Sequence, residues 1–412
     1  MIKNIILSGG WGFSNLGDDA ICMACVDLLL TKYPEAIITI ETFSVEELSH
    51  IFAHNARVNI VESLYKKLYN EYTSLEEFEF LKSNSELLLK KILNKVPLLS
   101  WMKDEFTSIL DDKELKHIFS NSESFIHKNE LLFEDYISCC KQADLYVMGG
   151  GHFLNTWSRS LISKYFEVYL AKKYNVPCIM IGQTYGPIKS YHGKMMGKYI
   201  LNNMNVISFR DTPSLDEEEV RDIDCDISVL PDLALTEKMD LPAGDFITYI
   251  PFKLSKRNYL SFCKKLSRLS VSYGRPVKIL VSQLWYNAIE IATDVYLILK
   301  QLNIDVVLII PRDIMSLQEE IADSYLVLSE NLHGLILAYR AQRCIVCLNK
   351  NNKFITFMEQ IKSSAIENIN QLGEDENSLL YLSNKAFSEQ TGNNCYRINH
   401  EQLFKDYLNL LP

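Results

Sequence analysis

Three polar or glycine-rich loops, each directly after an apolar run, contain the residues best suited to bind a small ligand. The first covers residues 8–19 (SGGWGFSNLGDD), and its end opens a helix near Asp18. Glycines let a ligand or another backbone come close, and the N–H groups at a helix start attract anions. Gly10, Gly12 and Gly17 match neither the GxGxxG nor the P-loop spacing. The loop therefore indicates close approach of a ligand, with a simple capping turn as an equal alternative.

Two more loops of this kind follow later apolar runs. Gly149, Gly150 and Gly151 stand in a row before His152, and residues 182–187 read GQTYGP, with Gln183 directly after the first glycine. Three consecutive glycines after a strand cost conformational entropy and are seldom needed for packing alone. We expect them to form a tight turn against a ligand or a neighbouring backbone.

Two further positions could supply charge or transfer a proton. Arg210 ends a strand (SFRD), where its guanidinium could bind an anion in a bidentate manner. An ion pair between Arg210 and Asp211 that organises the turn explains the spacing equally well. His333 (SENLHG, residues 329–334) follows a strand and opens a helix, a good position for a general acid or base. A helix cap or a packed ring is the commoner role of a lone histidine.

Cysteine spacing offers a metal or redox interpretation that we do not favour. Cys22 and Cys25 share one face of an apolar helical pattern, and Cys344 and Cys347 point to opposite faces of a strand-like run. Packing in the core explains both pairs better than a zinc site or a reactive dithiol. We therefore predict no metal site at these cysteines.

The elements that position these loops alternate between short apolar strands and amphipathic helices, which is typical of βα units in a parallel sheet. The expected strands are residues 4–8, 36–41, 144–148, 177–182, 205–209 and 227–230, and then 246–250, 277–282, 305–310, 325–328 and 344–348. Two Rossmann-like domains are therefore predicted, at residues 1–240 and 241–395, with a closing helix in 396–412. Sites in such folds lie at the carboxyl ends of the strands.

Residues 62–140 do not fit this rhythm and predict a helical insertion in the first domain. Inside it, residues 86–103 (ELLLKKILNKVPLLSWMK) combine an apolar arc with a lysine-rich arc. Five lysines and one glutamate between residues 82 and 103 give a local charge of 5 − 1 = +4. The pattern suits a helix lying on an anionic membrane, but we slightly favour an ordinary surface helix with its lysines in water.

Length, composition and charge limit the classes of protein to which the chain can belong. The 412 residues suit two domains, and 48% hydrophobic content indicates a folded chain. The 42 basic and 52 acidic residues give 42 − 52 = −10, which disfavours general binding to nucleic acid. No signal-peptide core and no run long enough to span a membrane is evident, so we expect a cytoplasmic protein whose ten cysteines are reduced.

Six short motifs, in their order along the chain, resemble the polysaccharide pyruvyl transferase family. They are NLGDDA (15–20), DLYVMGGG (144–151), GQTYGP (182–187), SFRDTPS (208–214), LPDLAL (230–235) and ENLHG (330–334). The resemblance implies a GT-B-like fold and transfer of pyruvate from phosphoenolpyruvate, as co-substrate, onto two sugar hydroxyls as a cyclic ketal, with no metal and no other cofactor. The sugar would belong to a cell-surface polysaccharide precursor, for which a lipid-linked form is one candidate, at the inner face of the membrane.

The same resemblance assigns roles to individual residues. His333 would transfer protons, and Arg210, Asn331 and Lys353 would bind the donor anion. Acceptor-binding residues in the first domain would be Asn15, Asp18, Gly150, Gly151 and Gln183. One departure concerns the donor: many family members have Arg-Leu-His where this chain has Asn-Leu-His, and an amide cannot replace a guanidinium on phosphate. Other cations could hold the anion instead, for which Arg312, Arg340, Arg343, Lys350 and Lys353 are the candidates.

Three rival functions use the same sequence. A glycosyltransferase on this scaffold would take a nucleotide sugar, because one fold hosts many chemistries. A dinucleotide oxidoreductase is disfavoured by the missing GxGxxG. An inactive scaffold would dock on the membrane through residues 86–103.

Overall fold

A computed structural model describes residues 2–71, 112–113, 115–155, 158–237, 239, 241–283, 288–391 and 398–412. The chain divides into two units. The first comprises Met1–Gly10, Leu29–Val229 and Leu411, and the second comprises Trp11–Leu28, Leu230–Leu410 and Pro412. Each unit contains its own parallel sheet.

The first unit is built on a sheet of eight strands. Its spatial order is β3 (Val58–Glu62), β2 (Ile37–Thr42), β1 (Asn4–Ser8), β4 (Leu145–Met148), β6 (Cys178–Tyr185), β7 (Val206–Phe209) and β8 (Asp226–Val229), and β5 (Gly151–Leu154) also pairs with β6. All pairs are parallel. The order reverses between β1 and β4, since the chain first builds outward to β3 and then returns to β4. That reversal is where ligands bind in open α/β sheets.

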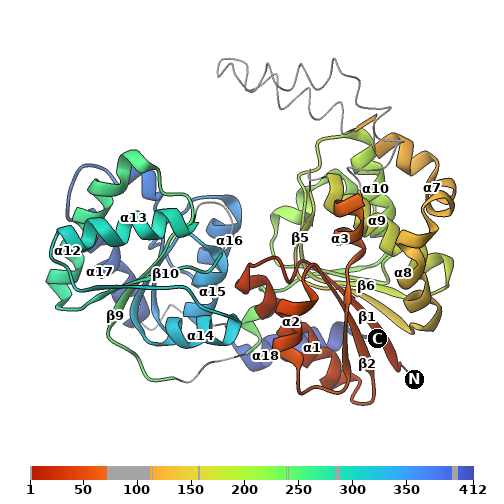
Figure 1. Cartoon of the computed structure of the whole chain (residues 1–412), viewed down its shortest axis with the longest axis horizontal. Coiled ribbons are helices and arrows are strands. Elements are labelled where there is room, and N and C mark those ends of the chain that lie inside the picture. The colour runs from red at the N-terminus through yellow and green to blue at the C-terminus, as the bar shows by residue number, and fades with distance from the viewer. Residues whose placement is uncertain are drawn as a thin grey trace. The chain divides into compact units, whose positions relative to one another are not determined.

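The helices of the first unit include α2 (Val45–Phe52), α3 (Leu64–Glu71), α7 (Ser122–Lys128), α8 (Glu130–Gln142), α9 (Ser158–Lys173), α10 (Tyr191–Asn202) and α11 (Glu218–Arg221). Helix α9 packs against α3, α8 and α10 in one layer (Figure 1). Phe125, Phe133 and Phe166 join α7, α8 and α9 through ring contacts of 5.1–6.2 Å. Burial of these rings fixes the helical layer.

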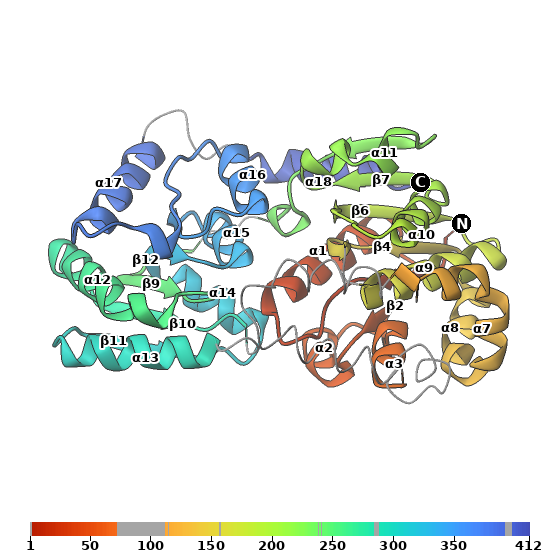
Figure 2. The ribbon, with the colours of Figure 1, turned by 90° about the horizontal axis from the view of Figure 1, so that it is seen from above.

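The second unit has five strands in the order β11 (Val306–Ile309), β10 (Val277–Leu280), β9 (Phe246–Ile250), β12 (Ser324–Ser329) and β13 (Cys344–Cys347). Its helices are α12 (Tyr259–Tyr273), α13 (Ala288–Gln301), α14 (Ile314–Ala322), α15 (Leu332–Arg340), α16 (Asn352–Gln360), α17 (Ser378–Thr391) and α18 (His400–Leu410), together with the start of α1 (Leu16–Lys32). Helices α12, α13 and α17 lie on one side of the sheet, and α14 and α15 on the other (Figures 1 and 2).

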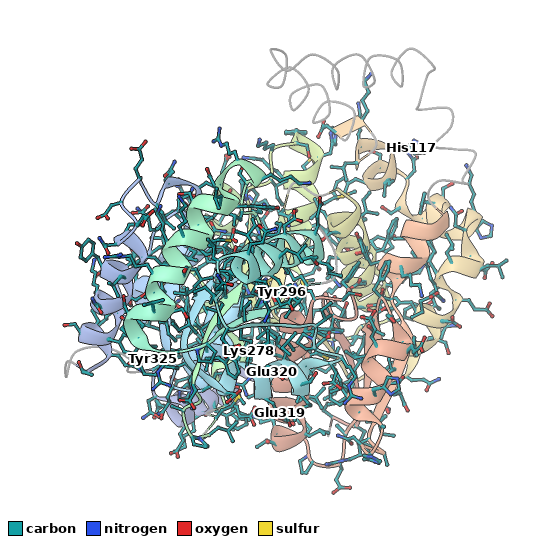
Figure 3. All side chains as sticks on the ribbon, turned by 60° about the vertical axis from the view of Figure 1, so that its left-hand side comes forward. His117, Lys278, Tyr296, Glu319, Glu320 and Tyr325 are labelled. Carbon is teal, nitrogen blue, oxygen red and sulfur yellow. The ribbon has the colours of Figure 1, made fainter. Side chains whose placement is uncertain are left out.

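A buried lysine fastens α14 to this sheet. Lys278 on β10 is almost fully buried, and its Nζ lies 2.7 Å from the carboxylate of Glu320 and 3.0 Å from that of Asp323 (Figure 3). The ammonium also stands 4.5 Å from the centre of the Phe246 ring. Pairing offsets the desolvation of the buried charge.

The predicted fold class is confirmed, because two parallel α/β sheets form and each expected strand is present within one to three residues of its predicted ends. Two strands were missed. Strand β3 is a partly exposed edge strand, and β5 is a four-residue segment after three glycines, so neither has a strong apolar signal. Of residues 62–140, the described part is helical beyond Glu62. The segment 86–103 lies outside the described residues, so its membrane interpretation stays a prediction.

The division of the chain differs from the expected boundary in one respect. We expected residues 1–240 to form the first domain, but Trp11–Leu28 group with the second unit, which resumes at Leu230. An isolated antiparallel bridge joins Asn15 to Gln283, and Gly17 packs on His333. The residues that make these contacts lie far apart in the sequence, and no local sequence pattern predicts the contacts.

The paired cysteines are core residues. Cys22, Cys25, Cys344 and Cys347 are all buried, and burial raises the pKa of both Cys344 and Cys347 to about 12. Such thiols stay protonated at neutral pH. Within the described ranges, no cluster of metal-ligating side chains occurs and no helix is long and apolar enough to cross a membrane.

Candidate functional site

The order of strands in the second unit reverses between β9 and β12, which are neighbours in the sheet. The loop after β9 begins at Pro251, and the loop after β12 leads through Glu330 into α15. Ligands of open α/β sheets bind where such loops diverge. His333 lies in the first turn of α15 and is therefore at this reversal.

Asn331 forms the N-cap of the helix that carries His333. Its side-chain oxygen accepts the backbone N–H of Gly334 at 3.0 Å. Ser329 supports the same turn, since its hydroxyl accepts the N–H of Asn331 at 3.0 Å and donates to the carbonyl of Asn331 at 2.8 Å. The cap starts the helix at a fixed residue, so the direction of the His333 side chain is set locally.

The first polar loop meets His333 directly. His333 Nε2 lies 3.6 Å from Asp18 Oδ1, and a Cβ added to Gly17 would stand only 2.1 Å from the Cβ of His333. Only glycine permits this approach of backbone to ring. Asn15 donates from Nδ2 to Asp18 Oδ2 at 2.5 Å, which holds the carboxylate in place. A carboxylate beside an imidazole stabilises the protonated ring, as a proton-transfer residue requires.

Glu330 joins the loops on the two sides of the reversal. It is 1% exposed, accepts the N–H groups of Phe252 and Lys253 at 3.2 and 2.9 Å, and accepts the hydroxyl of Tyr249. Burial raises the pKa of Glu330 to about 7, against the lowering effect of these hydrogen bonds. The loop after β9 is thus tied to the residue that precedes the N-cap of α15.

The candidate cations of the second unit differ in position and in partners. Lys353 is exposed in the first turn of α16, which follows β13, and its Nζ lies 5.5 Å from the Phe354 ring centre. Leu348 N–H donates to the carbonyl of Ser329 at 2.8 Å, so the loops after β13 and β12 run together. Among the other candidate cations, Arg340 pairs with Glu237 and Lys350 with Glu367. Arg312 is exposed, and Arg343 donates to the carbonyl of Leu241.

A second group of predicted residues assembles in the first unit. Gly149 N–H donates to the carbonyl of Ser8 at 2.8 Å, which joins the loops after β4 and β1 at the reversal of that sheet. Gln183 donates from Nε2 to the carbonyl of Gly149, and Gly151 pairs with Gln183 in the β5–β6 ladder. Gly151 has φ of 144°, a conformation that L side chains rarely adopt. The structure thus brings Gly150, between these glycines, close to Gln183.

Arg210 lies at the end of the neighbouring strand of this group. Its Nε donates to Thr184 Oγ1 at 2.9 Å, and the Thr184 hydroxyl donates to Asp211. Asp211 also accepts the hydroxyl of Ser214 at 2.6 Å. Thr184 therefore links Arg210 to Asp211 through hydrogen bonds. This arrangement is close to the alternative in which Arg210 and Asp211 pair with each other to organise the turn.

Beneath this edge lies a buried polar network that no sequence motif indicates. Lys164 and Glu167 of α9 form a 2.9 Å ion pair, and Glu167 also accepts the hydroxyls of Ser8 and Tyr146 at 2.7 Å each. Burial and the charge of Glu167 raise the pKa of the nearby Glu41 above its ordinary value. In the sequence, the spacing of Lys164 and Glu167 on one helix is typical of an ordinary surface ion pair.

The predicted residues thus fall into two groups. Asn15, Asp18, Asn331 and His333 come together in the second unit, and Lys353 lies in the first turn of α16, after the neighbouring strand β13. Gly150, Gly151, Gln183 and Arg210 lie in the first unit. The sequence predicts Asn15 and Asp18 on the first-domain side, whereas their contacts with each other, Gln283 and His333 lie in the second unit, and their role in acceptor binding stays a prediction.

Two α/β units with parallel sheets and loops gathered at the strand ends define a GT-B-type fold. The structure of UDP-GlcNAc 2-epimerase from Neisseria meningitidis bound to UDP-GlcNAc is similar, with a TM-score of 0.54, 12% identity and coverage of 99% of both chains. A putative UDP-N-acetylglucosamine 2-epimerase from Listeria monocytogenes gives a TM-score of 0.54 and 11% identity, covering 99% of this chain and 95% of the other. At these identities the likeness shows the fold alone.

The family is shown by sequence. The model of the family described as polysaccharide pyruvyl transferase matches residues 15–352, most of the chain, and this chain belongs to that family. It is accordingly a transferase of polysaccharide modification. None of the curated proteins matches it significantly.

Proposed function

We propose that the protein transfers pyruvate from phosphoenolpyruvate to two hydroxyls of a sugar in a cell-surface polysaccharide precursor, at the cytoplasmic face of the membrane. The observation that carries the proposal is the contact of His333 with Gly17 and Asp18, because it makes a proton-transfer pair from two family motifs. Both motifs lie within the matched residues. The contact between the two motifs gives a chemical role to Asp18 in one and to His333 in the other.

The chemistry needs protons moved at defined atoms. Protonation of the methylene carbon of phosphoenolpyruvate makes its neighbouring carbon electrophilic, and one sugar hydroxyl adds there as it loses its proton. Phosphate then leaves with its bonding electrons, and the second hydroxyl closes the ketal and releases the second proton. His333, with Asp18 stabilising its protonated form, would donate or accept these protons.

The donor's phosphate and carboxylate need cations and N–H donors. Lys353 is an exposed cation in the first turn of α16, which follows the strand next to β12, and we assign it to the donor with Asn331 at the start of α15. Arg210 is assigned to the donor as well, and Gly150, Gly151 and Gln183 to the acceptor, from the family resemblance. Asn331 contributes by fixing the helix start, since its side-chain oxygen already accepts the Gly334 N–H.

Phosphate release from phosphoenolpyruvate, measured with and without a panel of glycans and lipid-linked sugars, tests this function. We expect release only with an acceptor, and a rise in melting temperature with phosphoenolpyruvate alone. Asp18→Asn should reduce turnover at least tenfold with the same melting behaviour, and Asp375→Asn, an exposed carboxylate remote in sequence, is the matched control. Stabilisation by a nucleoside diphosphate, with none by phosphoenolpyruvate, would instead identify a glycosyltransferase.

A further inference from the structure

Two buried carboxamides stand side by side near His333 without using their oxygens. Asn15 and Gln283 face each other in an isolated antiparallel bridge. Residues directly opposite in such a pair project to the same side, with Cβ atoms about 4.5–5.5 Å apart. Each side chain is 7% exposed, and among the described residues neither Asn15 Oδ1 nor Gln283 Oε1 accepts a hydrogen bond.

The orientation of the Asn15 amide is fixed by its neighbour. Its Nδ2 group donates to Asp18, so the oxygen is the atom left over. Unpaired buried oxygens are costly, and native proteins pair the great majority of them. Two on the same side of one bridge, in the loop that supplies Asp18 to His333, point to a ligand that brings hydrogen-bond donors.

From this geometry we infer that Asn15 and Gln283 form the subsite for the hydroxyl groups of a neutral sugar acceptor. The inference rests on the proposed function and names the residues of this chain that would select its acceptor. Carboxamide oxygens accept hydrogen bonds from hydroxyls and offer nothing to a phosphate, which has only acceptor oxygens at neutral pH. The Asp18 carboxylate next to Asn15 adds negative charge that disfavours an anion further. The subsite therefore takes the polyol, and the anionic donor contacts other groups.

Gln318 supplies a matched control. It is another buried glutamine of the second unit, 6% exposed on α14, and its Nε2 makes no hydrogen bond within the described part of the chain. If unpaired carboxamides were only packing defects, Gln283→Met and Gln318→Met would behave alike. Both changes remove an unpaired polar atom at nearly constant volume, so both variants should melt at or above the wild-type temperature.

Binding separates the two variants. The probes are the methyl glycosides of galactose, glucose, mannose and N-acetylmannosamine. Their binding to the full chain is measured by saturation-transfer NMR. Loss of one neutral hydrogen bond corresponds to roughly a threefold to tenfold weaker affinity. We expect Gln283→Met to weaken the preferred glycoside by about that factor, Gln283→Asn to weaken it less, and Gln318→Met to bind like wild type.

Equal binding by wild type and Gln283→Met would overturn the inference, and so would failure of every methyl glycoside to bind the wild type. The phosphoenolpyruvate melting shift is recorded on the same samples and should be unchanged in all variants. Loss of that shift in the wild type counts against the proposed function. If the phosphoenolpyruvate melting shift is retained but wild type and Gln283→Met bind the glycosides equally, only the Asn15–Gln283 subsite is refuted.

Discussion

Replacing Glu330 with Gln is expected to remove a pH-dependent part of the stability of the second unit. The carboxyl group is buried between Tyr249 and the backbone of the loop after β9. Burial raises its pKa from 4.5 to about 7. The folded protein therefore holds a proton between pH 4.5 and about 7 that the unfolded chain releases.

The sign and size follow from this proton. A raised pKa in the folded state stabilises the fold fully below the unfolded value, and the stabilisation is lost as pH rises through the folded value. A pKa rise of about 2.5 at about 1.36 kcal/mol per pKa unit corresponds to about 3 kcal/mol. For a unit of this size, that is roughly 6–12 °C in melting temperature.

The assay is thermal unfolding of wild type, Glu330→Gln and the exposed-residue control Glu319→Gln at pH 5, 6, 7 and 8. The Gln variant should carry a constant penalty, because its amide cannot accept at both positions that the carboxylate serves. Relative to it, the wild type should lose about 6–12 °C between pH 5 and 8, while Glu319→Gln should run parallel to wild type. Parallel curves for wild type and Glu330→Gln would refute the reasoning.

Three further changes test the site and its support. His333→Ala should abolish acceptor-dependent phosphate release and shift the melting temperature by only a few degrees; a collapse of stability would show a structural role instead. Gly17→Ala should cut activity at least tenfold, because its Cβ would stand 2.1 Å from that of His333, whereas Gly274→Ala, with open space around it but φ of 63°, should lower only stability and leave activity unchanged. Lys164→Met should destabilise the fold by about 3 kcal/mol by leaving Glu167 charged and buried, with partial recovery in a double variant carrying Glu167→Gln; equal urea midpoints for all three proteins would contradict this.

The sheets were predictable because local periodicity decides them. Strands such as β1 and β9 are continuous apolar runs bounded by turns, and their predicted ends match the structure. Strand β3, with only partly buried residues, carries no such signal, because an edge strand needs less apolar surface. The position of each ligand loop followed from the same pattern, since loops after parallel strands gather at one edge.

The partners of those loops were not predictable in the same way. Asn15 and Gln283 are 268 positions apart, and nothing in either segment indicates that they pair. The NLGDDA motif acquires a physical meaning only against His333, where Gly17 leaves room for the ring and Asp18 faces its nitrogen. A residue outside the family motifs, such as Gln283, becomes a candidate for ligand binding only because its side-chain oxygen is unpaired in the described part of the folded chain.

Position 331 shows how a departure from a family motif can be understood. In sequence, Asn331 reads as the loss of the guanidinium that many family members have there. In the structure its side-chain oxygen accepts the N–H of Gly334 and begins the helix of His333. Arginine has no acceptor and cannot cap a helix in this way, and a cap of this kind is worth about 1 kcal/mol. The asparagine therefore gives α15 a fixed start just before the turn that carries His333, the residue we propose for proton transfer.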